Sequence, residues 1–123
     1  MSGLQIHLAL AERVAARFSG KLAADPRLSQ DALTLQFADS LALELRFASA
    51  GEYAIHWAWG EAELRIDTAP LHRDLATFPN HLHDHEGTCR ADPLTVPGRD
   101  PWENVERVLE AVLADPLLRA AGA

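Results

Sequence analysis

Apolar residues recur at helical spacing along the first part of the chain. They fall on one side of a helical wheel, while the charged Glu12 and Arg17 fall elsewhere on it. This pattern predicts an amphipathic N-terminal helix from about residue 3 to residue 24. Asp25-Pro26 follows, and we expect the helix to end there because the residue before a proline disfavours the α region. The apolar positions are Leu4, Leu8, Ala11, Ala15, Phe18 and Leu22.

The pattern changes to alternation with a period of two between about residue 31 and residue 67. Four consecutive segments alternate in this way, which predicts four strands that each bury one face. Short polar turns separate the segments, and connections this short join neighbouring antiparallel strands. Trp57 and Trp59 share the parity of the buried positions, whereas Arg65 and Asp67 have the opposite parity. The segments are Leu33–Phe37, Leu41–Phe47, Tyr53–Trp59 and Leu64–Asp67.

An irregular stretch and a second helix follow the predicted strands. Residues 68–87 hold two prolines and four of the six histidines, so we expect a His-rich loop there. Thr88–Leu94 could form a short fifth strand. A helix is predicted over about residues 101–114, with Asp100 as its N-cap. The predicted fold is α+β, with an antiparallel four- to five-stranded meander sheet and an N-terminal and a C-terminal helix, all in a single domain that covers residues 1–123.

Composition and charge narrow the class of protein. The formal net charge is −7 and Lys21 is the only lysine. Tight, non-specific binding to nucleic acid is therefore not expected, because contacts of Lys and Arg with phosphates supply most of that affinity. No apolar run approaches the ~20 residues that cross a bilayer. A single cysteine, Cys89, suits a reducing compartment, so a cytoplasmic protein is expected, with Cys89 as a packing residue.

The string His81-Leu82-His83-Asp84-His85 is the most unusual feature of the chain. If this string is extended, the three histidines point to one side. His81, His83 and His85 could then begin a divalent-metal site, which His72 or Asp67 would complete. Two other interpretations stand beside the metal site. The histidines could act as acid and base without a metal, or they could only shape a surface loop.

Acid–base chemistry would need two imidazoles near one reacting group. Histidine titrates near neutral pH, so His72 together with His81 or His83 could serve as base and acid on one phosphodiester. Arg65 would stabilise the charge that develops on the phosphate, and Asp67 would orient a ring. The simpler interpretation of Arg65 and Asp67 is a cross-strand ion pair on an exposed face.

Two linked motifs resemble a known family. The first runs from Arg65 to His72 and the second from Thr77 to His83. Over about Tyr53–Leu113 they resemble the TumE-like toxins of bacterial toxin–antitoxin modules. In that family the first motif reads Arg-Tyr-Asp-Asn-Ala-Pro-His-His, and the second reads Thr-Phe-Pro-His-His-Lys-His. The matching residues are Arg65, Asp67, Ala69, Pro70, His72, Thr77, Phe78, Pro79, His81 and His83. The chain departs from the family at Ile66, Thr68, Leu71 and Asn80.

The resemblance implies a toxin with ribonuclease activity that a helix-turn-helix antitoxin protein holds. Histidine acid–base chemistry without a metal cofactor would cleave RNA and leave a 2′,3′-cyclic phosphate. The residues expected to carry it are His72, His81, His83, Arg65 and Asp67. If the family uses a histidine where this chain has Leu71 or Asn80, the chain would be an inactive or binding relative. Two alternatives remain: a hydrolase that depends on a divalent metal, and a non-catalytic protein-interaction module.

Overall fold

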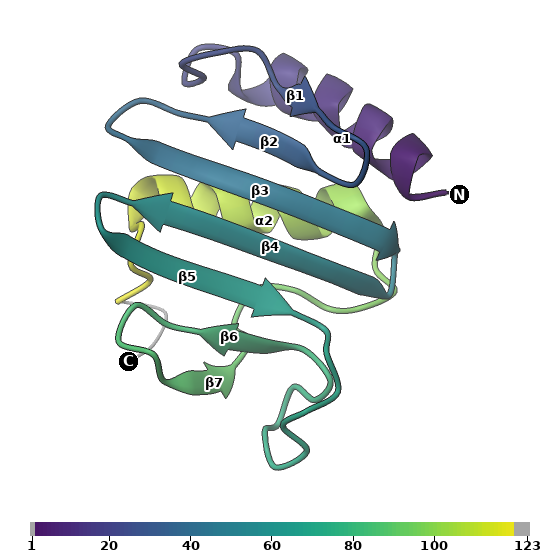
Figure 1. The fold of residues 1–123 in the computed structure, drawn as a ribbon, viewed down its shortest axis with the longest axis vertical. Coiled ribbons are helices and arrows are strands. Elements are labelled where there is room, and N and C mark those ends of the chain that lie inside the picture. The colour runs from purple at the N-terminus through teal and green to yellow at the C-terminus, as the bar shows by residue number, and fades with distance from the viewer. Residues whose placement is uncertain (1, 120–123) are drawn as a thin grey trace.

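An antiparallel sheet occupies the centre of the fold (Figure 1). The structure is a computed structural model that describes residues 2–119. Within that range the strands pair in the order of the sequence, so every neighbour in the sheet is also a neighbour along the chain. The strands are β1 (Arg27–Leu28), β2 (Leu33–Gln36), β3 (Leu41–Ser49), β4 (Glu52–Trp59), β5 (Ala62–Asp67), β6 (His81–His83) and β7 (Cys89–Ala91).

The predicted α+β class and the antiparallel meander are confirmed, but the predicted number of strands is wrong. Seven strands are present among the described residues, rather than four or five. The extra strands are β1 and β6, whereas β7 lies inside the expected fifth strand at Thr88–Leu94. The sheet therefore continues past Asp67, and part of the expected His-rich loop at 68–87 is the strand β6. Strands of two or three residues are too short to show alternation in the sequence.

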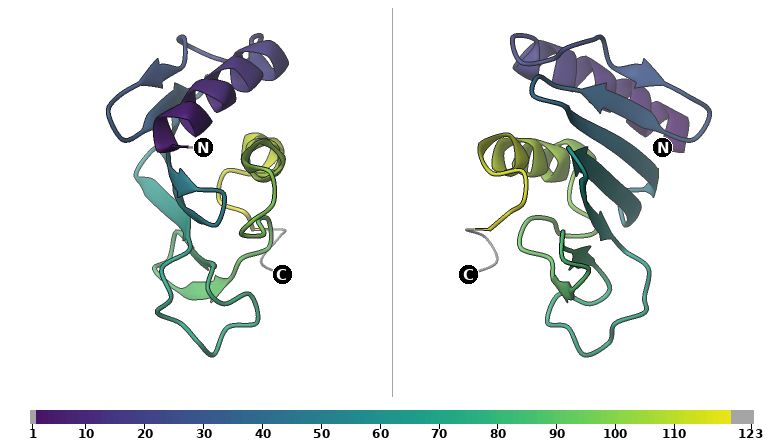
Figure 2. Two further views of the ribbon diagram at one scale, coloured as in Figure 1. Left: turned by 90° about the vertical axis from the view of Figure 1, so that its right-hand side faces the viewer. Right: turned by 60° about the vertical axis from the view of Figure 1, so that its left-hand side comes forward.

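Both helices lie on one face of the sheet (Figure 2). That face carries the alternating apolar residues of the long strands, and Trp57, at 0% exposed, lies in its middle. Within residues 2–119 the opposite face has no helix over it, and it holds the residues of opposite parity, among them Arg65 and Asp67. This face is called the open face below. Trp59 has core parity but is 39% exposed at the end of β4, so its predicted burial is wrong.

The helices differ from their predictions at their ends. α1 spans Gly3–Phe18 and stops before the predicted end near residue 24, because the chain turns at Gly20 and Leu22 pairs with Phe37 at the edge of the sheet. α2 spans Pro101–Ala114, the predicted range. Asp100 is its N-cap residue, although the Asp100 side chain makes no capping hydrogen bond. Among the described residues, no helix has the length and apolar character that a membrane crossing requires.

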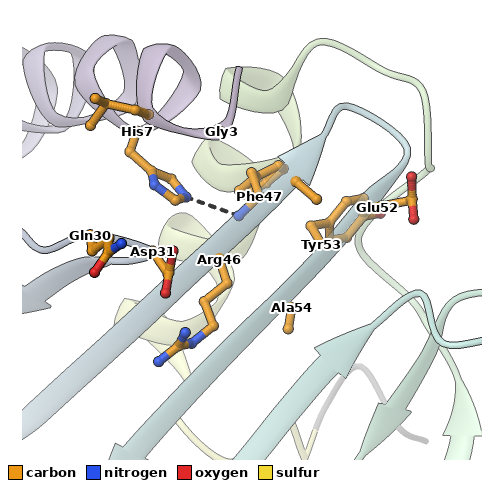
Figure 3. Close-up of a pocket in the computed structure, with 11 residues that line it drawn as sticks. Gly3, His7, Gln30, Asp31, Arg46, Phe47, Glu52, Tyr53 and Ala54 are labelled. Atoms are coloured by element: carbon orange, nitrogen blue, oxygen red, sulfur yellow. Dashed lines mark hydrogen bonds between the residues drawn. The ribbon is translucent and has the colours of Figure 1, made fainter. Parts of the chain in front are cut away.

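The N-terminal part of α1 covers an otherwise unpaired edge of β3 (Figure 3). The pairing of β2 with β3 ends at Leu45, so the N–H of Phe47 has no partner in β2. That N–H donates to His7 Nε2 at 2.9 Å. His7 is buried, and burial lowers its pKa. A buried neutral imidazole thus completes the hydrogen bonding of the strand where the sheet stops.

Candidate functional site

Three neighbouring strands bring four of the predicted residues onto the open face. Arg65 of β5 pairs with His83 of β6, and two residues further along β5, Asp67 pairs with His81. On the other side of β6, His83 pairs with Cys89 of β7. Because paired residues in a sheet project to the same side, these five side chains form two adjacent rows. The site therefore depends on the register of the two short strands β6 and β7.

Asp67 lies at the centre of this arrangement and is 8% exposed. Its Oδ1 accepts the backbone N–H of Ala69 at 3.0 Å and lies 3.0 Å from His81 Nε2. Its Oδ2 accepts Arg65 Nε at 2.8 Å and lies 3.5 Å from His83 Nε2. One carboxylate thus fixes the positions of a guanidinium, the His81 imidazole and the first turn of the segment that follows β5.

His81 is the buried histidine of the group, at 1% exposed. Its Nδ1 lies 3.1 Å from the carbonyl oxygen of Pro79 and therefore carries a hydrogen, because a carbonyl oxygen only accepts. Its Nε2 faces Asp67 Oδ1, which in its ionised form is also an acceptor. Both nitrogens of His81 are engaged within the protein.

His72 and His83 are the more exposed members of the group. His72 comes from the segment between β5 and β6, and its ring centroid lies 4.8 Å from that of His81 and 6.1 Å from that of His83. The His83 side chain is 32% exposed. A pocket of about 270 Å³ opens beside it, lined by His83, Arg65, His56, Glu63 and Leu64. A ligand on the open face can therefore reach His83.

The charge next to His83 favours its neutral form. Partial burial lowers the pKa of His83, and the Arg65 guanidinium lowers it further, while Asp67 opposes these effects. Arg65 Nη2 lies 3.3 Å from His83 Nε2. Since a guanidinium can only donate, Nε2 of His83 is the accepting nitrogen, and the neutral ring carries its hydrogen on Nδ1. His83 thus presents a lone pair at Nε2.

A buried polar network holds the segment that precedes His81. The Asn80 amide donates to Asp92 Oδ2 at 2.7 Å and to the carbonyl oxygen of Thr95 at 2.9 Å. The Thr95 hydroxyl donates to Asp92, and the Tyr53 hydroxyl lies 2.6 Å from Thr95 Oγ1. Burial raises the pKa of Tyr53 to about 12. This network connects β4, the start of β6 and the turn after β7.

Comparison with known proteins identifies the family. A family model described as Toxin TumE matches residues 8–119 of the 123-residue chain. The chain belongs to this family. The resemblance inferred from the two motifs is confirmed, and the match extends well beyond the expected Tyr53–Leu113. No curated protein and no solved structure matches the chain.

The residues that depart from the TumE-like motifs lie apart from the histidine rings or support them. Ile66 is buried on the core face, and Leu71 is 75% exposed. The Thr68 hydroxyl accepts the N–H of Tyr53 at 3.0 Å. Asn80 belongs to the Asp92 network described above, so an amide has a clear structural role at this position. In this TumE-family chain, Asn80 positions the strand that carries His81 and His83.

Two sequence expectations about the site need correction. His85 does not continue the row of His81 and His83, because β6 ends at His83 and a turn begins at Asp84. His85 Nε2 lies 3.8 Å from Glu86 Oε1, and among the described residues His85 is absent from the groups able to hold a metal. Cys89, expected to be only a packing residue, lies beside the histidines. The pairing of β6 with β7 could have revealed this position, had the register been known.

A second hollow adjoins the site along the open face. It encloses about 520 Å³, and Arg46 and Ala54 form part of its lining (Figure 3). Ala54 pairs with Arg46 on one side and with Asp67 on the other, so this hollow and Asp67 share one row of the sheet. Asp31 and Glu52 also line the hollow, which therefore has mixed charge.

Proposed function

We propose that this TumE-family chain is the toxin of a toxin–antitoxin pair and cleaves RNA by histidine acid–base chemistry. The observation that carries the proposal is the convergence of His72, His81 and His83 on Asp67 and Arg65. A lone histidine on a loop would mean little, but a base and an acid within one phosphate's reach can catalyse transesterification of RNA. Membership of a toxin family supports an activity that harms the cell.

His83 serves as the base in this mechanism. A bound phosphate attracts the Arg65 guanidinium and releases Nε2 of His83, which then takes the proton of the ribose 2′-hydroxyl. The 2′-oxygen attacks the phosphorus while the bond to the 5′-oxygen breaks. His72, in its protonated form, gives its proton to that leaving oxygen. The products are a 2′,3′-cyclic phosphate and a free 5′-hydroxyl, so the protons and bonds balance.

Arg65, Asp67 and His81 support these two histidines. Arg65 places positive charge beside the phosphorane, where negative charge increases in the transition state. His81 has both ring nitrogens engaged, so we assign it to positioning rather than to proton transfer. Arg46 offers a second cation along the row that continues from Asp67. These local arginines compensate for the acidic net charge, which disfavours RNA binding elsewhere on the molecule.

A helix-turn-helix antitoxin is the proposed partner. The family description names a toxin, and a toxin that is kept harmless in its own cell needs a protein that binds it. Leu4 is 52% exposed and Leu8 is 46% exposed, one turn apart on α1, which supports a protein contact there. If the chain only binds a partner and does not act on RNA, the open-face histidines would have a structural role alone.

The direct test is cleavage of a defined RNA oligonucleotide by purified protein in EDTA. We expect products with a 2′,3′-cyclic phosphate and a 5′-hydroxyl. A matched oligonucleotide with a single 2′-deoxy nucleotide at the cut position should resist cleavage there, because it lacks the attacking group. Intact RNA at high protein concentration, or equal cleavage of the deoxy oligonucleotide, would contradict the proposal.

The pH dependence of cleavage tests the role of His83. A base must be neutral to act, so kcat/KM should fall as the pH drops through the pKa of His83, which burial and Arg65 lower from the ordinary histidine value. Arg65→Gln removes a cation that lowers this pKa, so the acidic limb of the profile should move to higher pH. The maximum value of kcat/KM should also fall. Arg46→Gln is the control, because Arg46 does not contribute to the shift of His83. An acidic limb that stays in place in the Arg65 variant would exclude His83 as the base.

A further inference from the structure

Cys89 gives the open-face site a second kind of chemistry. The thiol sulfur of Cys89 and one ring nitrogen each of His72 and His81 all lie within 4.8 Å of one another. His81 also belongs to a second such group, with Asp67 and His83. Thiolate and imidazole together are the ligands that Zn²⁺ prefers, whereas Mg²⁺ and Ca²⁺ prefer oxygen. The group that contains Cys89 is therefore selective for a soft divalent ion.

The hydrogen bonding of His81 already matches that of a metal ligand. In metal sites, a ligating histidine commonly donates its other ring N–H to a backbone carbonyl or carboxylate. His81 Nδ1 faces the carbonyl oxygen of Pro79 in this way. Its Nε2 lies 3.0 Å from Asp67 Oδ1 and is the ring nitrogen that remains to bind a metal ion.

We propose that His72, His81 and Cys89 bind Zn²⁺ and that the bound ion inhibits RNA cleavage. In a tetrahedral zinc site the Zn–N bonds are ~2.0 Å long and the Zn–S bonds ~2.3 Å. The ligand atoms then lie about 3.5 Å from one another. The three side chains must therefore approach by about an ångström, which rotation of the partly exposed His72 and Cys89 can supply. The inhibitory role rests on the proposed function, because the ion would bind His72, the proposed acid. Metal binding itself does not depend on the proposed function.

Cobalt reports the ligands directly. Tag-free protein titrated with Co²⁺ should develop tetrahedral d–d bands and a near-ultraviolet thiolate-to-cobalt band. Cys89→Ser should abolish the thiolate band and weaken metal affinity by at least about tenfold, since a strong ligand is lost. His85→Ala is the matched control and should leave both unchanged. A titration without the thiolate band would overturn the site, and undiminished affinity in the Cys89 variant would favour the Asp67, His81 and His83 group instead.

Inhibition is measured separately from binding. Zn²⁺ should stop RNA cleavage by the native chain, and EDTA should restore it. Cys89→Ser should cleave RNA normally in EDTA and need at least about ten times more Zn²⁺ for inhibition. Stimulation of cleavage by Zn²⁺, or equal sensitivity of both proteins, would overturn the inhibitory role. Cobalt binding with a thiolate band in a protein that never cleaves RNA would leave the metal site standing and reject the proposed ribonuclease.

Discussion

Replacing His83 with alanine is expected to lower the rate of RNA cleavage by about 10²–10⁴-fold. His83 is the accessible imidazole whose Nε2 accepts from Arg65 until a phosphate binds, and its loss removes the proposed base. His72→Ala should cause a loss of similar size, since it removes the proposed acid. The double variant should be little worse than either single one, because the two groups act in one step. Initial rates on a short RNA in EDTA measure all three variants.

A histidine outside the cluster provides the control for this experiment. His85 follows β6 at the turn, and its Nε2 lies 3.8 Å from Glu86 Oε1. Replacing His85 with alanine should leave cleavage within about threefold of the native rate, which corresponds to less than 1 kcal/mol. Normal cleavage in both the His72 and the His83 variants, with folding confirmed by circular dichroism, would reject the proposed pair.

Asp92→Ala is expected to lower the free energy of unfolding by about 3 kcal/mol. The Asp92 carboxylate accepts the backbone N–H groups of Leu94 and Thr95 at 2.7 and 3.1 Å, as well as the Asn80 amide. Alanine would leave buried donors without acceptors, and each such donor costs about 1–3 kcal/mol. Unfolding in urea, followed by tryptophan fluorescence, gives the difference.

Asp74→Ala is the control for charge. Asp74 is exposed on the segment between β5 and β6, so its removal changes the net charge equally but leaves no buried donor. Its effect should stay within about 0.5 kcal/mol. The Asp92 variant should also cleave RNA more slowly at a temperature where it remains folded, because Asn80 then positions His81 less well. Equal stability of the two variants would show that the network around Asp92 contributes little.

The long elements of the fold could be predicted from the sequence because their patterns repeat several times. α2 and the strands from Leu33 to Asp67 each show enough periods to identify both the element and its buried face. β6 does not, since it contains only three residues and its polar positions are histidines. Its register with β5 and β7 places Cys89 next to His83, and no local pattern contains that information.

The sequence pattern also could not predict that the three histidines lie in different environments. His81 and His83 have the same parity, so the pattern predicts equal exposure for both. The segment after β5 packs against His81 and leaves His83 accessible. The reason for an amide at Asn80 is equally non-local, because its partner Asp92 lies twelve residues later. The structure brings His72, His81, His83, Arg65 and Asp67 together, but their individual environments could not be assigned from the sequence.

The order of the strands has a consequence for a cell that makes this protein. Each strand pairs with the one synthesised just before it, so the sheet can assemble stepwise during translation. The core face, however, needs α2, whose apolar residues are fully buried against it. A nascent chain whose α2 is still inside the ribosome would hold the histidines on an unsupported sheet. The histidines therefore reach their supported positions only after α2 has packed against the sheet. The apolar residues concerned are Val105, Val108, Leu109 and Val112.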